Sequence, residues 1–196
     1  MNPTSGLFFL LPLTLCLALH PHLTVAATNS TNATTTTKAT GGLIEKACSR
    51  SHNKAKDFCL WLLNSNPDSK TATDLKDLAI IALGAAYHNA SETSMKIQSW
   101  FSDTGAEHAL NDALSTCDEA YIDVVDQIGD SETALVSGAN GDVKSLMKVA
   151  VARIDACDAG LKGLTMAHAV ELTKQNRALR QSCNVALRIV HVVAHG

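Results

Sequence analysis

The feature that most constrains the fold is a set of apolar residues that recur every three or four positions in four long segments of the chain. Steps of four and three residues bring side chains to one face of an α-helix, so each segment predicts a helix with an apolar line, here called a seam, that faces a core. The seam of the second segment consists of Leu110, Leu114, Cys117, Tyr121, Val124 and Ile128.

The other three segments have the same periodicity. The first, at about residues 74–101, has a broad face of mostly small residues, namely Leu75, Leu78, Ala79, Ala82, Ala85, Ala86 and Tyr87. The third follows a break at SGANGD, where Asp142 is a candidate helix cap, and its seam consists of Met147, Ala150, Ile154, Cys157, Leu161 and Leu164. The fourth seam consists of Leu172, Leu179, Cys183, Ala186, Val190 and Val193, with Asn176 as a polar member. The four segments predict an all-α fold, an up-and-down four-helix bundle over residues 73–196.

Composition and motifs exclude several classes of function. The 16 Lys and Arg residues are scattered among 19 acids, and the net charge is -3, so we expect no nucleic-acid partner. The chain has no His-Glu-x-x-His zinc pattern, no P-loop and no Gly-x-Ser-x-Gly nucleophile elbow. We therefore expect no catalytic site, no metal and no cofactor.

The beginning of the chain predicts export from the cell. The apolar run at residues 7–19 is followed by Val25 and Ala27, which suit signal-peptidase cleavage, so we expect residues 1–27 to be a signal peptide. A membrane anchor is the alternative, but the run is shorter than the roughly 20 residues that cross a bilayer and contains Pro12. We expect a secreted protein that is not held in a membrane once the signal is removed.

A Thr-rich stretch at residues 28–42 follows and predicts a solvated linker, because it has almost nothing to bury. Three Asn-x-Ser/Thr sequons, at Asn29, Asn32 and Asn89, are candidate glycosylation sites in a secreted protein.

Removal of the signal would remove Cys16 and leave an odd number of cysteines, which predicts two disulfides and one unpaired thiol in an oxidising compartment. Cys117 and Cys157 lie on the seams of neighbouring helices, so a bridge between them needs no unusual geometry. Cys183 also lies on a seam, where we expect a buried and unreactive thiol; the alternative is an intermolecular or redox cysteine.

Cys48 and Cys59 then remain as a pair ahead of the bundle. They lie in two short helical pieces, residues 43–50 and 54–63, neither of which would be stable alone in water. A disulfide that closes so short a loop stabilises the folded state by roughly 3 kcal/mol. We expect a helical hairpin over residues 43–66 whose FCLWLL run packs on the bundle or on a partner. A metal clip and a thioredoxin-like thiol site are disfavoured, because both need a shorter cysteine spacing.

One polar arrangement stands out on the second bundle helix. Glu119, Asp123 and Asp126, here called the acidic stripe, are spaced i, i+4 and i+7 and share a face that points away from the seam. The spacing allows two interpretations. One is a solvated surface, since like charges at this spacing cost only a few tenths of a kcal/mol. The other is a docking face for a partner.

Several of these features together resemble the plant invertase and pectin methylesterase inhibitor domain. They are the Cys48-x10-Cys59 hairpin, Asn-Pro-Asp-Ser at residues 66–69, the helix start TATDLKDLA, the Cys117-x-x-x-Tyr121 motif and the later Cys157. The resemblance covers about residues 42–196. It implies a four-helix bundle after a hairpin, with disulfides Cys48–Cys59 and Cys117–Cys157. It also implies a non-enzymatic inhibitor, secreted to the plant apoplast and cell wall, that occludes the substrate cleft of its target.

The family implies two targets, pectin methylesterase and acid invertase. Pectin methylesterase inhibitors resemble the chain around the acidic stripe, which would dock beside the pectin-binding cleft, and they often have an unpaired cysteine in the last helix, as at Cys183. Their target-contacting Thr before the last framework cysteine is Ala156 here. Invertase inhibitors use Pro-Lys-Phe after a Gly-Asp pair, and only Lys144 of that motif is present. We expect a pectin methylesterase inhibitor; the alternatives are an invertase inhibitor and a non-inhibitory binding protein.

Overall fold

A computed structural model of the protein describes residues 41–102 and 108–195, and these residues contain helices and no strands. The elements are α2 (Lys54–Ser65), the 3-10 helix η1 (Pro67–Lys70), α3 (Leu75–Trp100), α4 (His108–Val136), α5 (Asn140–Gly160) and α6 (Ala167–His195). Residues 41–48 are also helical, including residues 41 and 42 of the expected linker. The rest of that linker, the expected signal peptide, Asn29 and Asn32 lie outside the described residues. The expected all-α fold is confirmed.

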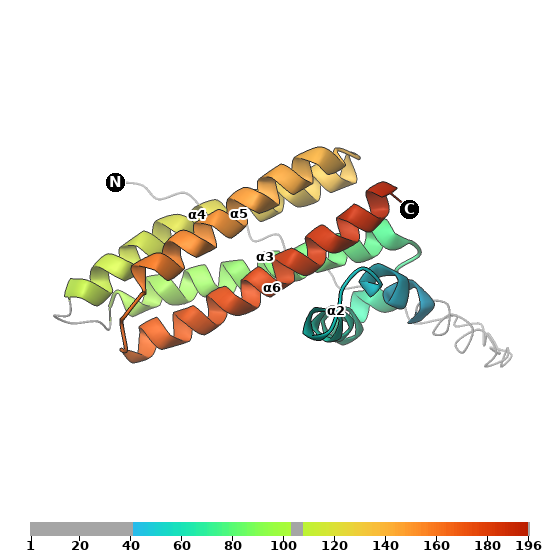
Figure 1. The fold of residues 1–196 in the computed structure, drawn as a ribbon. Helices are drawn as coiled ribbons and strands as arrows, with labels where there is room; N and C mark the ends of the chain where they lie inside the picture. The colour runs from blue at the N-terminus through green and yellow to red at the C-terminus, as the bar shows by residue number, and fades with distance from the viewer. Residues whose placement is uncertain (1–40, 103–107, 196) are drawn as a thin grey trace, which may run out of the picture. The chain divides into compact units, whose positions relative to one another are not determined.

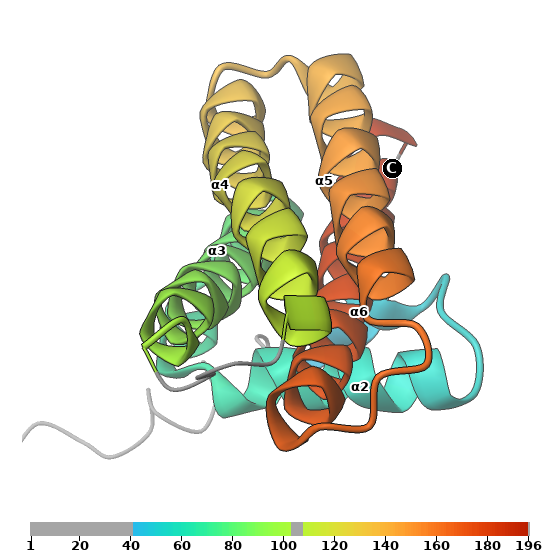
Figure 2. The same ribbon diagram turned by 90° about the vertical axis from the view of Figure 1, so that its left-hand side faces the viewer.

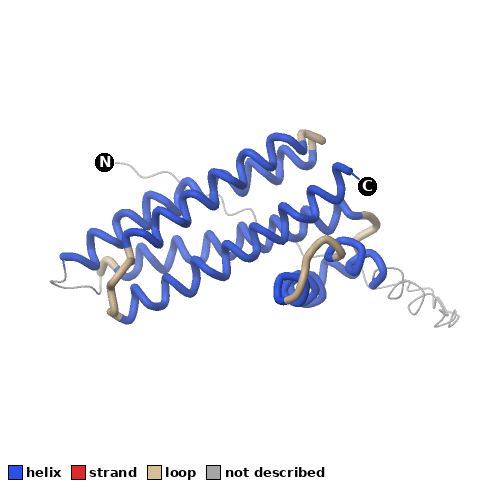
Figure 3. The backbone as a smooth tube through the Cα atoms, in the orientation of Figure 1, coloured by secondary structure: helices blue, strands red, loops and turns tan. Residues whose placement is uncertain are grey.

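Helices α3 to α6 form an up-and-down bundle in which successive helices run in opposite directions (Figure 1). Helices α4 and α5 lie side by side, α3 and α6 form the second pair, and the ring is closed by contacts of α3 with α4 and of α5 with α6 (Figure 2). The backbone tube in Figure 3 shows the short connections between α4 and α5 and between α5 and α6. No helix in the described part of the chain is long and apolar enough to cross a membrane.

The seams form the core of this bundle. All six residues of the second seam are buried, and Asn176 is buried with its apolar neighbours on α6. The prediction was wrong at Tyr87, which is 42% exposed. Its ring lies instead along the surface of α4, where a Cβ added to Gly129 would be 3.5 Å from the ring.

Side-chain caps define where α3 and η1 begin. The Asp74 carboxylate accepts a hydrogen bond from the backbone N–H of Asp77 at 2.9 Å. Asp77 in turn accepts hydrogen bonds from the backbone N–H and hydroxyl of Thr73, and these donors lower the pKa of the Asp77 carboxyl, the backbone bond contributing most. Asn66 caps η1 by accepting from the backbone N–H of Asp68 at 2.9 Å, which explains the local role of the Asn-Pro-Asp-Ser motif.

The predicted cap of α5 was wrong. The helix begins at Asn140 with Ala139 at its N-cap, so Asp142 lies within the first turn. The helix begins early because Gly138, at φ +83°, reverses the chain immediately after α4. A carboxylate in the first turn still interacts favourably with the helix dipole.

The hairpin lies across the bundle near the start of α3 and the end of α6, with α2 crossing the bundle helices (Figure 2). Cys48 and Cys59 form a disulfide, and Leu62 and Leu63 are buried. The Arg188 guanidinium on α6 donates a hydrogen bond to the carbonyl of Arg50 at 3.1 Å. The expectation that the whole FCLWLL run packs was wrong at Trp61, which is 62% exposed because it lies on the side of α2 that faces solvent.

The two disulfides are expected to stabilise different parts of the protein. Replacing both Cys48 and Cys59 with Ala should lower the free energy of unfolding by about 3 kcal/mol, and replacing both Cys117 and Cys157 by about 4 kcal/mol, because the second bridge closes a longer loop. Chemical denaturation measures both losses. Hydrogen exchange should show faster exchange of residues 41–65 in the first variant with the bundle still protected; loss of protection throughout the bundle would contradict the local role of the hairpin bridge.

Candidate functional site: the outer face of α4 and α5

The acidic stripe lies on the solvent side of α4. Glu119 and Asp126 are exposed, and no polar partner for either occurs within the described residues. Asp123 is about half-exposed and accepts from Nε of Arg153 on α5 at 2.8 Å. Two of the three carboxylates are therefore free to meet a partner, while the charge of the third is already compensated by a neighbouring cation.

The structure adds residues to this face that the charge pattern did not indicate. Ile122 is 50% exposed between the carboxylates, and Asp130, also exposed, continues the stripe by one further turn. On α5, Val149 is 43% exposed and precedes Arg153 by one turn. Ile122 and Val149 could have been identified from the sequence as apolar residues that do not belong to the seams of their helices. The face is thus both acidic and apolar.

Ala156 and Lys144 lie at different places on α5. Ala156 is exposed, and it follows Arg153 by three residues, so it belongs to the side of α5 that carries Arg153 and Val149. Lys144 is exposed in the early part of α5 and contributes to the lowered pKa of His191 on α6, after desolvation and the charges of His195 and Arg50. Lys144 precedes Arg153 by nine residues along α5 and is therefore separated from the acidic stripe.

A polar network, buried at Tyr121 and Asn176 and half-buried at Asp158 and Arg180, lies behind this face. The Tyr121 hydroxyl donates to Oδ1 of Asn176 at 2.7 Å, and Nδ2 of Asn176 donates to Oδ1 of Asp158 at 2.6 Å. Arg180 completes the network through Oδ2 of Asp158 at 2.6 Å and also binds Asp155. Burial raises the pKa of the Tyr121 phenol well above its usual range, so the hydroxyl keeps its proton and donates. Helices α4, α5 and α6 are joined by these bonds.

The three cysteines next to the network are in two different states. Cys117 and Cys157 form a disulfide between α4 and α5, with Cα atoms 4.5 Å apart, and Nδ2 of Asn176 lies 3.2 Å from Sγ of Cys157. Cys183 is an unpaired, buried thiol on α6. Burial raises the pKa of Cys183 to about 12, which keeps the thiol protonated at neutral pH.

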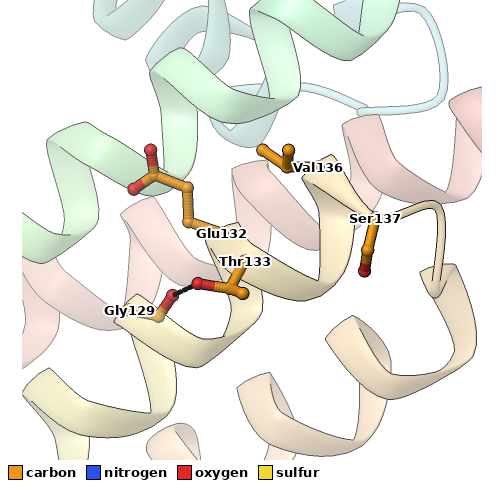
Figure 4. A pocket seen from close by; sticks show the side chains of 5 residues that line it. All are labelled: Gly129, Glu132, Thr133, Val136 and Ser137. Carbon is orange, nitrogen blue, oxygen red and sulfur yellow. Dashed lines mark hydrogen bonds between the residues drawn. The ribbon is translucent and has the colours of Figure 1, made fainter.

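The described residues include a surface recess on α4 but no cluster of metal ligands. No group of three or more His, Cys, Asp or Glu side chains within them is arranged to hold a metal ion. Figure 4 shows a shallow recess on the last turns of α4 that is lined by Gly129, Glu132, Thr133, Val136 and Ser137. Glu132 is its only titratable group, so it offers no acid–base pair. The candidate functional site is therefore the exposed surface of α4 and α5.

Comparison with known proteins assigns the family. Residues 42–189 match the model of the family described as plant invertase/pectin methylesterase inhibitor. The chain belongs to this family. The match covers the hairpin, α3, α4 and α5 completely and most of α6, so the resemblance expected from the sequence is confirmed.

Individual members of the family show similarity over most of the chain. A pectinesterase inhibitor from Actinidia deliciosa is 29% identical over 163 residues, which cover 80% of this chain and 82% of that protein. A crystal structure of a mutant form of a pectin methylesterase inhibitor from Arabidopsis superposes with a TM-score of 0.64 at 23% identity, covering 76% of this chain and 95% of the other. A second crystal structure, of a pectin methylesterase inhibitor from Arabidopsis thaliana, gives a TM-score of 0.56 at 22% identity, covering 76% of this chain and 93% of the other. The solved structures therefore share the fold of this inhibitor-family protein.

The unpaired thiol of this family member is expected to be unreactive while the protein is folded. Because burial keeps Cys183 protonated and inaccessible, a thiol reagent such as iodoacetamide at pH 8 should label it very slowly in the native state and stoichiometrically in denaturant. Mass spectrometry of the purified protein measures both, and Cys183→Ala should abolish the labelling in denaturant. Rapid native labelling, or a dimer that dissociates only under reducing conditions, would instead support the redox or intermolecular role.

Proposed function

We propose that this protein is a secreted, reversible inhibitor of pectin methylesterase that acts in the plant cell wall by covering the substrate cleft of the esterase. The observation that carries the proposal is the acidic and apolar outer face of α4 and α5, in a chain that belongs to an inhibitor family and is similar to a pectinesterase inhibitor. Inhibition needs no catalytic group or cofactor, only a surface that competes with the substrate for the cleft.

The outer face has the composition of a protein-binding surface. Exposed Ile122 and Val149 can lose water-accessible apolar area on binding, at roughly 25 cal/mol per Å². Glu119 and Asp126 can form charge-assisted hydrogen bonds with basic groups of a partner. The acids also steer the encounter and set its orientation, because charge complementarity mainly affects association rate and specificity. We infer that the complementary surface of the esterase is basic at its rim.

The structure favours pectin methylesterase over acid invertase as the target. Of the residues at the invertase-inhibitor motif, Val143 is fully buried, whereas Lys144 and Ser145 are exposed, and the Ser145 hydroxyl donates a hydrogen bond to the carbonyl of Gly141 in its own helix. A segment whose central residues belong to the first turns of a packed helix has little to insert into an active site. A non-inhibitory binding protein on the same bundle remains the competing hypothesis.

An inhibition assay distinguishes these functions. The disulfide-intact protein, free of glycan and produced in bacteria, should inhibit a plant pectin methylesterase in a reversible, saturable way and leave an acid invertase unaffected, at both acid and neutral pH. Inhibition of invertase alone would support the second target. No inhibition of either enzyme at micromolar concentration would refute the proposal.

The acidic stripe is expected to contribute unequally to binding. Glu119→Gln and Asp126→Asn should each weaken inhibition by about three- to tenfold, because each removes a charge-assisted hydrogen bond worth somewhat less than about 1.5 kcal/mol at the rim. Asp123→Asn should have a smaller effect, because Arg153 already compensates Asp123. The inhibition constant, measured by titration at low and high salt, tests this order.

Asp57→Asn is the matched control, because Asp57 is also an exposed acid but lies on α2, which contacts α3, α6 and η1 rather than α4. It makes the same change in net charge and should leave the inhibition constant within a factor of two. If all four variants weaken inhibition equally, net charge rather than the stripe determines binding, and the docking-face assignment fails.

Restoring the family's hydroxyl at Ala156 is expected to improve binding. Ala156 is exposed, so Thr fits without a steric clash. If the side chain reaches a polar group of the esterase, Ala156→Thr should tighten inhibition about fivefold, which corresponds to roughly 1 kcal/mol for one hydrogen bond. Ala156→Val, which has the same shape without the hydroxyl, is the control. Equal effects of the two substitutions would show that volume, not hydrogen bonding, matters at this position.

A further inference from the structure

A groove away from the outer face of α4 and α5 has no role in the proposed inhibition. It lies between α2, α3 and α6 and encloses about 410 Å³, within the range of ligand pockets, about 300–1,000 Å³. Phe58 and Trp61 form its aromatic wall, with ring centroids 5.5 Å apart. Trp61 is 62% exposed. Nothing in the described part of the chain covers this ring.

Asn89 on α3 lies on another wall of the same groove and begins the sequon Asn89-Ala90-Ser91. Its side chain is half-buried, and the side-chain amide makes no hydrogen bond within the described residues. The backbone carbonyl of Asn89 accepts a hydrogen bond from the Thr93 hydroxyl. Ala90 is fully buried, which fixes the rotation of α3 and holds Asn89 toward the groove. The glycosylation acceptor and the uncovered tryptophan therefore line one cavity.

We propose that Asn89 carries an N-linked glycan whose first N-acetylglucosamine fills this groove and packs against Trp61. A glycan on Asn89 is the occupant of this groove that the sequence itself indicates, because the sequon lies in the wall of the groove. The proposal rests on secretion, as in the proposed function, because the glycan donor is a lipid-diphosphate-linked oligosaccharide of the secretory pathway. Nδ2 of Asn89 bonds to C1 of the sugar and loses one proton, and the lipid diphosphate leaves.

The groove matches the chemistry of the sugar. A pyranose ring has an apolar face of C–H groups that packs on an indole ring, whereas its hydroxyl and acetamido groups need polar partners. Such partners are available around the groove from Ser65, His88 and Glu92; Nε2 of His88 lies 3.3 Å from Oε1 of Glu92. The helical conformation of Asn89 is no obstacle, because the oligosaccharide is transferred to the nascent chain before it folds.

Glycopeptide mass spectrometry of the full chain secreted from plant cells gives the first test, and Asn89 should be occupied. Thermal unfolding gives the second. Ser91→Ala, which removes the glycan and keeps Asn89, should lower the Tm by about 2–4 °C. Trimming the glycan enzymatically to its first sugar should leave the Tm unchanged. Wild type and Ser91→Ala made in bacteria, without glycan, should have equal Tm values, which controls for the serine itself.

The decisive comparison changes Trp61. Trp61→Ala should lower the Tm of the glycosylated protein by about 2–4 °C but should have little effect in the Ser91→Ala background. An unoccupied Asn89 overturns the proposal, and so does an equal effect of Trp61→Ala with and without the glycan. Asn32→Gln, which removes a different sequon, should not alter the effect of Trp61→Ala. Inhibition by the bacterial, glycan-free protein is measured separately, so failure of this proposal is distinguishable from failure of the proposed function.

Discussion

Hydrogen bonds join the buried residues Tyr121 and Asn176 to the half-buried Asp158 and Arg180, and these bonds determine how the helices fit together. Apolar seams alone tolerate a shift of one helix along another, because one small apolar residue can replace the next. A buried polar residue specifies the register, since only one arrangement supplies its partner. A shift would leave Asn176 and the Tyr121 hydroxyl unpaired, at a cost of about 1–3 kcal/mol for each group. The network therefore gives the bundle one arrangement out of several that the seams permit.

The same network gives the outer face of α4 and α5 its rigidity. Tyr121 points inward from the turn of α4 that carries Glu119 and Asp123 outward, and the Cys117–Cys157 bridge joins α4 to α5 in this region. A surface formed by two crosslinked helices is already ordered before a partner binds. Association with a rigid surface costs less conformational entropy than association with a flexible loop. The contributions of its exposed charges to binding can be compared by single substitutions, because these substitutions leave the fold unchanged.

Much of the fold could be predicted from the sequence because the seams repeat over many turns. Cys117 and Tyr121 were placed in the core by periodicity alone. The partners of Asn176 could not be predicted, since they lie 18 and 55 residues away and depend on how three helices are rotated. The exposure of Trp61 and Tyr87 was missed for a related reason. Periodicity predicts which residues share a face, but neighbouring elements determine how much of that face they cover.

The position of the hairpin has a consequence for biosynthesis. Cys48 and Cys59 can pair soon after they are made, because their bridge spans only 11 positions of the chain. The surface that receives the hairpin includes α6, and Arg50 meets Arg188 and His191 across separations of 138 and 141 residues. The first of the described helical elements to be synthesised therefore cannot dock fully until the last has been made. Until α6 has been synthesised, the disulfide restricts the conformations open to residues 48–59.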